Sequence, residues 1–183
     1  MEKALKDKLR SELLWTSTKQ GAFQRSRIYE KPEKIKLNKN DESKEKKKLR
    51  IFLEKFLYEE IYIGCKNRKI EEDELYKIIN RLINKVNKKF RKILRDNKMR
   101  FGNAQKFVNL YLKLMWIAGW GKEPPHFPVD RIIQRNLPGI YPWTDMNKET
   151  YRKIITNANN VRKNNSVKTL AMWETLEYLE LSK

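Results

Sequence analysis

One segment constrains the fold more than any other: residues 103–119, where apolar side chains occupy almost every position around a helix. A helix that is apolar on nearly all sides must be surrounded by other elements, so we expect it in the middle of the molecule. Gly119 and Gly121 follow it, and glycine commonly ends helices. The proline-rich segment 124–128 then favours an extended loop.

Two more long helices are predicted before this segment. Apolar side chains recur at intervals of three and four from about residue 42 to 65 and from about 71 to 94, which is the spacing of one buried helix face. Further helices are expected at 130–136, after a cap at Thr144 or Asn147, and after a cap at Ser166. No segment shows a convincing strand pattern, so the prediction is an all-α bundle of about seven helices.

The N-terminal part of the chain differs in composition from the rest. Residues 2–15 can form a short amphipathic helix. Residues 31–48 are rich in lysine and nearly devoid of large apolar side chains, which is typical of a solvated linker, although a basic arm lying on phosphates would have the same composition. We therefore divide the chain into an N-terminal helix with a basic arm, residues 1–48, and an all-α core, residues 49–183.

The charge is strongly unbalanced, with 42 Lys and Arg against 23 Asp and Glu and a net charge of +19. Such an excess repels itself in a compact fold, which indicates a polyanionic partner. Nucleic acid is the first candidate and an anionic membrane surface the second. The alternative is a genome that enriches lysine for other reasons.

Several classes of protein are excluded or disfavoured. The only cysteine is Cys65, so an internal disulfide, a four-cysteine iron–sulfur cluster and a cysteine-rich zinc site are excluded. His126 is the only histidine, which argues against a histidine-based metal site. The first residues lack an apolar signal core, and no run of 18 apolar residues is present. We expect a cytoplasmic protein that needs no metal and no cofactor.

A lysine and an aspartate each stand at a predicted helix start. A turn at Gly102 leads into the apolar helix, which carries Lys106 near its beginning, and the next helix opens at Pro128-Val129-Asp130. An amine held near a carboxylate is what covalent excision of a DNA base requires. Each residue also has an ordinary interpretation, Lys106 as a surface lysine and Asp130 as a helix cap.

The segment 101–135, about a fifth of the chain, resembles the core of the helix-hairpin-helix DNA glycosylases, nearest the archaeal 8-oxoguanine glycosylase branch. The spacing from Gly102 to Lys106 and the Pro128-Val129-Asp130 step carry the resemblance. Residues 98–102 stand where the family has its Leu-Pro-Gly-Val-Gly hairpin. The resemblance implies a two-lobed, all-α fold that binds double-stranded DNA and takes the target nucleotide out of the stack.

The resemblance also implies roles for individual residues. Lys106 would attack the sugar and form a Schiff base, and Asp130 would stabilise the positive charge that develops as the base leaves. The extruded base would stack on one or more aromatic rings of a base pocket, for which the candidates are Trp116, Trp120, His126 and Phe127.

Contacts with the nucleic-acid backbone are expected from two kinds of residue. Gly102 and Asn103 would offer amides at a helix start to a phosphate. Cations would contact other phosphates, and the candidates are Arg25, Arg27, Arg81, Lys85, Lys88 and Lys89. Two other functions remain open: a non-enzymatic nucleic-acid-binding protein, and a basic interaction protein with an acidic protein partner. The enzyme requires Lys106 and Asp130 to face one cleft, whereas an interaction protein should expose an apolar patch within its basic surface.

Overall fold

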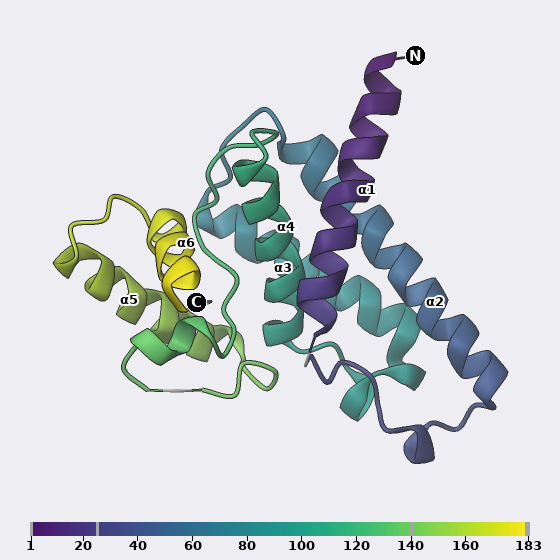
Figure 1. The fold of residues 1–183 in the computed structure, drawn as a ribbon. Coiled ribbons are helices and arrows are strands. Elements are labelled where there is room, and N and C mark those ends of the chain that lie inside the picture. The colour runs from purple at the N-terminus through teal and green to yellow at the C-terminus, as the bar shows by residue number, and fades with distance from the viewer. Residues whose placement is uncertain (1, 25, 140, 182–183) are drawn as a thin grey trace.

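The computed structural model describes residues 2–24, 26–139 and 141–181, and these contain helices but no strand. The prediction of an all-α bundle is confirmed, and the described residues form six α-helices (Figure 1). They are α1 (Glu2–Phe23), α2 (Lys39–Phe56), α3 (Glu72–Phe90), α4 (Phe101–Ile117), α5 (Lys148–Asn164) and α6 (Leu170–Leu181). An isolated β-bridge joins Tyr29 to Leu94.

Helix α4 lies at the centre, as its composition predicts. Thirteen of its 17 residues are buried, and it contacts α1, α3 and α5. Figure 1 shows it between α1–α3 on one side and α5 and α6 on the other. Some of the buried residues are polar, among them Asn103, Gln105 and Lys106. Buried polar groups must find partners within the protein, so the beginning of α4 is organised for more than apolar packing.

Helix α1 packs along α4 and is longer than the sequence pattern predicts. Its inner face includes Leu14 and Trp15, and Ser11 Oγ lies 2.7 Å from Tyr111 Oη of α4. Leu5, Leu9 and Leu13 lie on the outer face and remain 52–63% exposed. The N-terminal segment is therefore part of the helical body.

Helix α2 begins inside the segment that we expected to be a linker. The Asn38 side chain caps it by accepting a hydrogen bond from the Asp41 amide at 2.9 Å. The boundary expected at residue 48 thus lies within a continuous helix. After Phe56 the helix continues as a π-helical segment, Leu57–Ile63. Residues 31–38, with a short 3₁₀ turn at Pro32–Lys34, form the irregular connection between α1 and α2.

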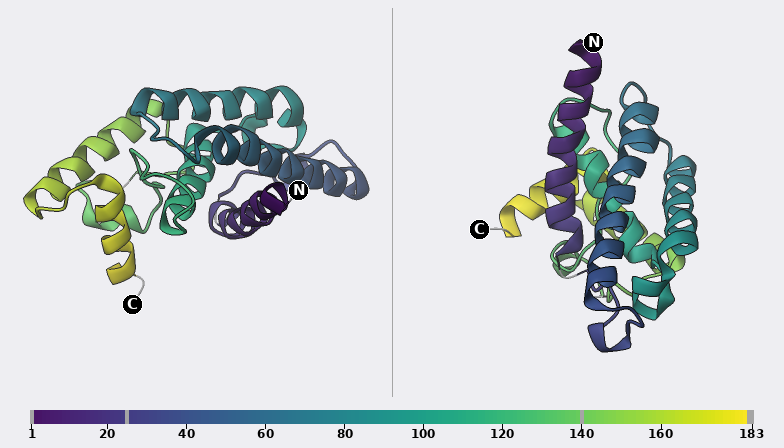
Figure 2. Two further views of the ribbon diagram at one scale, coloured as in Figure 1. Left: turned by 90° about the horizontal axis from the view of Figure 1, so that it is seen from above. Right: turned by 90° about the vertical axis from the view of Figure 1, so that its right-hand side faces the viewer.

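A long connection leads from α4 to α5 and contains the 3₁₀ turn η5 (Ile133–Asn136). Asn147 caps α5 by accepting from the Thr150 amide at 2.8 Å, as one of the two alternatives predicts. At α6, Thr169 Oγ1 accepts from the Met172 amide at 3.2 Å, three residues beyond the expected cap. Figure 2 shows α5 and α6 grouped at one side of the molecule. In the described part of the chain, no helix is long and apolar enough to span a bilayer.

Candidate active site

Lys106 and Asp130 meet in the structure. Lys106 lies near the start of α4, and the connection after α4 folds back along this helix until Asp130 reaches the same level. The Nζ of Lys106 is 3.3 Å from Oδ2 of Asp130, and their side chains are 9% and 19% exposed. The two residues that the sequence pattern singles out are therefore an ion pair that is largely withdrawn from water.

The two carboxylate oxygens of Asp130 have different partners. Oδ1 accepts from the amides of Ile132 at 2.9 Å and Ile133 at 3.3 Å, which is the geometry of a helix cap. Oδ2 faces Lys106. The capping hydrogen bonds fix the orientation of the carboxylate. Asp130 is therefore a helix cap and the partner of Lys106 at the same time.

Trp143 lies beside the Lys106 amine, with Nζ 4.5 Å from the ring centroid. Gly102 allows the segment that carries Trp143 to approach α4, because a Cβ at Gly102 would lie only 1.7 Å from the Trp143 carbonyl oxygen. The Gly102 amide donates to the Met146 carbonyl at 3.1 Å. No pattern in the sequence connects Trp143 with Lys106.

The amides at the start of α4 do not face an open surface. Gly102 and Asn103 are both buried, and Asn103 Nδ2 donates to the Ser26 carbonyl at 2.8 Å. The expectation that these two residues contact a phosphate is corrected by this geometry. The reason is that segment 143–146 covers the helix start and takes the Gly102 amide as its own partner.

Two polar side chains of α4 hold the loop that carries Asp130. Gln105 Oε1 accepts from the Val129 amide at 3.1 Å, and Gln105 Nε2 donates to the Val129 carbonyl at 2.7 Å. Asn109 Nδ2 donates to the Phe127 carbonyl at 3.1 Å. Both side chains are fully buried. Sequence reasoning missed them, although two amides four residues apart in an otherwise apolar helix are a usable signal.

The ion pair lies at the wall of a cavity of about 480 Å³. Helices α1, α4 and α6 and the Asp130 loop surround it, and its apolar lining includes Leu110, Leu114, Ile117 and Pro128. A second buried pair lies in the same wall, with Lys113 Nζ 2.6 Å from Glu174 Oε2. Burial raises the pKa of Glu174, against the opposing effect of Lys113. We call this space the Lys106 cavity.

None of the four residues expected in a base pocket lines the Lys106 cavity. Phe127 is fully buried and packs edge-on against Trp173, with ring centroids 5.5 Å apart. Trp116 and Trp120 follow Lys106 by ten and fourteen residues, and ten residues of helix span about 15 Å. They therefore stand at the opposite end of α4. The aromatic residues that do border the Lys106 site are Trp143 and Tyr178.

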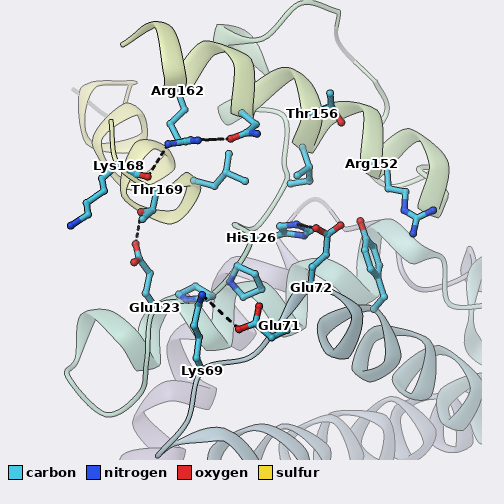
Figure 3. Close-up of a pocket in the computed structure, with 16 residues that line it drawn as sticks. Lys69, Glu71, Glu72, Glu123, His126, Arg152, Thr156, Arg162, Lys168 and Thr169 are labelled. Atoms are coloured by element: carbon cyan, nitrogen blue, oxygen red, sulfur yellow. Dashed lines mark hydrogen bonds and ion pairs between the residues drawn. The ribbon is translucent and has the colours of Figure 1, made fainter. Parts of the chain in front are cut away.

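His126 lines a different cavity, of about 700 Å³, between the start of α3 and helices α5 and α6 (Figure 3). Its Nδ1 lies 3.1 Å from Tyr151 Oη, and its Nε2 lies 3.7 Å from a carboxylate oxygen of Glu72. Burial lowers the pKa of His126 to about 4, and Glu72 acts in the opposite direction. We call this space the His126 cavity.

The cations expected to contact a nucleic-acid backbone are exposed but partly engaged. Arg27 is exposed, and Arg25 lies outside the described residues. Arg81 and Lys85 of α3 approach Glu60 to 3.4 and 3.0 Å. Lys88 is exposed, and Lys89 covers the ring of Phe52 at 5.0 Å. The four cations of α3 form an exposed basic stripe, and three of them (Arg81, Lys85 and Lys89) also hold α3 against α2 and the π-helical segment.

No family model, curated protein or solved structure matches this chain. Nowhere in residues 2–24, 26–139 and 141–181 do three or more His, Cys, Asp or Glu side chains form a group that could hold a metal ion.

Proposed function

We propose that this protein is a DNA glycosylase with β-lyase activity, which excises a damaged base through a Schiff base on Lys106. The observation that carries the proposal is the 3.3 Å approach of Lys106 to Asp130 at the wall of a cavity. Two residues 24 positions apart come together there, in the pairing that the resemblance of segment 101–135 implies. The cavity, at about 480 Å³, has a size usual for small-ligand sites.

The chemistry follows from these two side chains. An extruded nucleotide would place its base against the apolar lining and its sugar beside Lys106. The Lys106 ammonium must first give up a proton, and Asp130 Oδ2 is the nearest base to accept it. The amine nitrogen then bonds to the anomeric carbon as the bond to the base breaks, and the base departs with the electron pair.

Asp130 passes the proton that it accepted to the departing base and is a carboxylate again, which gives it a second role while positive charge develops on the sugar. Its capping hydrogen bonds hold Oδ2 in place, so this carboxylate is preorganised to stabilise that charge. In the ring opening, the nitrogen loses a proton and its lone pair forms the C=N bond of the iminium. The bond between the anomeric carbon and the ring oxygen breaks at the same time, and the oxygen keeps that electron pair and takes up a proton. Loss of a 2′ proton and departure of the 3′ phosphate complete the lyase step.

Borohydride trapping tests the proposal. The protein is mixed with duplexes that contain an abasic site, 8-oxoguanine or uracil, and the reductant converts an iminium into a stable amine. We expect a covalent protein–DNA band that disappears in Lys106→Arg. This variant keeps a cation opposite Asp130 but cannot form the Schiff base, so it is a better matched control than Lys106→Ala. Absence of the band on every substrate, with DNA binding retained, would refute the lyase.

One observation favours a second function, that of a basic interaction protein. Leu5, Leu9 and Leu13 form an exposed apolar stripe on α1, and Lys6, Lys8 and Arg10 lie between them in the sequence. An apolar stripe among cations fits an acidic protein partner that has its own apolar residues. Substitution of the three leucines by serine would abolish such an interaction and leave borohydride trapping unchanged, which separates the two functions.

A further inference from the structure

A third cavity, of about 420 Å³, lies between the N-terminal half of α1, the end of the π-helical segment and the turn that follows α4. Its lining contains four cations and one carboxylate. The cations are Lys3, Arg10, Lys66 and Lys122, and the carboxylate is Asp7. The half-buried ring of Trp120, which belongs to the turn, lines the same space. We call this space the Trp120 hollow.

The single carboxylate of the hollow is already satisfied. Asp7 is buried, accepts a hydrogen bond from Tyr62 Oη at 3.0 Å, and lies 2.5 Å from Lys66 Nζ. An ion pair of this kind neutralises one cation and fixes its position. Three positive charges remain without a counter-charge in the lining, so the hollow attracts an anion.

Arg10 is held in a defined place. Its guanidinium lies over the Trp120 ring, 5.3 Å from the centroid. Stacking on an aromatic face orients the planar guanidinium, which can then donate two parallel hydrogen bonds to one phosphate. The turn beneath it is tightly built, because a Cβ at Gly121 would lie 2.7 Å from the side chain of Met115.

The His126 cavity is larger but differs in charge. It has four cations, Lys69, Arg152, Arg162 and Lys168, but also three carboxylates, Glu71, Glu72 and Glu123 (Figure 3). Several of these groups have partners within the protein: Lys69 lies 3.7 Å from Glu71, and Arg162 donates to the Val167 carbonyl at 2.7 Å. Positive and negative charges in its lining therefore nearly cancel, and of these two cavities the Trp120 hollow has the larger excess of positive charge.

We infer that the Trp120 hollow binds a phosphate group of a nucleic-acid strand, with Lys3, Arg10 and Lys122 as its ligands. The hollow and the Lys106 cavity border the same two elements. Both lie against α1, and Ile117 of the Lys106 cavity precedes Trp120 of the hollow by three residues. A strand that places one nucleotide at Lys106 can therefore follow α1 and the end of α4 to the hollow. The identity of the anion as nucleic acid rests on the proposed function; the existence of an anion site does not.

The test compares two double variants of equal charge. Arg10→Gln/Lys122→Gln removes two exposed cations of the hollow and leaves Lys66 with Asp7. Lys77→Gln/Lys163→Gln removes two exposed cations that line neither cavity. Binding of a fluorescein-labelled oligonucleotide, single-stranded or duplex, is measured over a range of salt concentrations. Loss of two phosphate contacts should weaken binding about ten-fold and reduce the slope of log K against log salt by about 2.

Trp120 supplies a second readout. Oligonucleotide bound in the hollow should quench tryptophan fluorescence, and Trp120→Phe should remove most of that quenching. Inorganic phosphate and a nucleoside monophosphate serve as small probes. Quenching by these probes but not by oligonucleotide would overturn the assignment to nucleic acid. Equal salt dependence of the two double variants would overturn the site altogether.

Failure of this inference is distinguishable from failure of the proposed function. Lys106→Arg should bind oligonucleotide normally and give no borohydride adduct. If no adduct forms with the unmodified protein but the Arg10→Gln/Lys122→Gln variant alone loses affinity, the anion site in the hollow is supported and the glycosylase is refuted. If the adduct forms and both double variants bind the oligonucleotide equally well, the glycosylase is supported and the anion site in the hollow is refuted.

Discussion

Lys113 and Glu174 join the centre of the molecule to its last helix: Lys113 Nζ of α4 lies 2.6 Å from Glu174 Oε2 of α6, and both side chains are buried. The pair closes one wall of the Lys106 cavity. Lys113 Nζ also lies 5.1 Å from the centroid of the Tyr178 ring, so this one side chain joins α4 to α6 at two points.

Removal of one member of this pair should be costly. Lys113→Met leaves the Glu174 carboxylate buried without a counter-charge, which we expect to lower the free energy of unfolding by about 3–5 kcal/mol. The double variant Lys113→Met/Glu174→Leu removes both charges and should recover most of that loss. Urea unfolding of the three proteins checks this, and a double variant as unstable as Lys113→Met would contradict it.

Two substitutions of Asp130 should separate its structural and chemical roles. Asp130→Asn keeps a side-chain oxygen that can cap the Ile132 and Ile133 amides, so only the loss of the counter-charge to the buried Lys106 amine should lower stability, by about 1–3 kcal/mol. It removes the charge that faces Lys106, and the rate of adduct formation should fall by about 10²-fold or more. Asp130→Ala should lose the cap as well, which lowers stability by about a further 1 kcal/mol. Unfolding curves and trapping rates are measured in parallel.

Gln105 is expected to position Asp130 through the loop that both share. Gln105→Met removes the partners of the Val129 amide and carbonyl, and two unsatisfied buried groups should cost roughly 2–4 kcal/mol. The adduct should form more slowly, although Lys106 and Asp130 are intact. Wild-type stability of Gln105→Met would exclude this assignment.

Gly102 and Gly64 offer a matched pair of glycine substitutions. A Cβ at Gly102 would meet the Trp143 carbonyl oxygen at 1.7 Å, whereas at Gly64 the nearest heavy atom is 3.6 Å away. Gly102→Ala should lower stability by about 3 kcal/mol or more, because backbone must move. Gly64→Ala, in a right-handed helical conformation, should be neutral or stabilise by up to about 1 kcal/mol. Thermal denaturation of both variants checks the contrast.

His126 makes a prediction about pH. Its pKa in the folded protein is about 4, below the ordinary value near 6.5 in the unfolded chain. The unfolded state therefore takes up the proton first as the pH falls, and stability present above pH 6.5 is lost as the pH falls toward 4. Between pH 7.5 and 4.5 this loss should be about 2–3 kcal/mol.

The control for this pH dependence is His126→Asn, in which the same carboxylates titrate but the imidazole is absent. Urea unfolding of both proteins at the two pH values isolates the histidine contribution. An equal loss of stability in the two proteins would show that His126 is not responsible.

The sequence was sufficient for most of the helices and for one contact within the site, but the helix expected at 130–136 is only the 3₁₀ turn Ile133–Asn136. The periodicity of apolar residues predicted α2, α3 and α4, and the composition of α4 predicted its central place. The approach of Lys106 to Asp130 was required by the glycosylase interpretation and is present. Both residues lie within one short segment, so local geometry determines most of this contact.

The rest of the site comes from distant parts of the chain. Trp143 and Glu174 reach the Lys106 cavity through the packing of the 143–146 segment and α6 on α4, and no periodicity within a single helix indicates such a contact. The four residues expected in a base pocket lie away from the Lys106 cavity for a related reason. Trp116 and Trp120 are close to Lys106 in sequence, but a straight helix carries them away from it.

The pairing of α1 with α4 has a consequence for how the chain reaches its native state. Ser11 and Tyr111, in hydrogen-bond contact, are separated by 100 residues, and closing so large a loop carries an entropic cost that slows folding. During synthesis α1 emerges before its partner α4, which follows only after α2 and α3 have been made. The Lys106 cavity has α1 as one of its walls, so it is completed only when these two helices meet, and a nascent chain must keep the inner face of α1 uncovered until then.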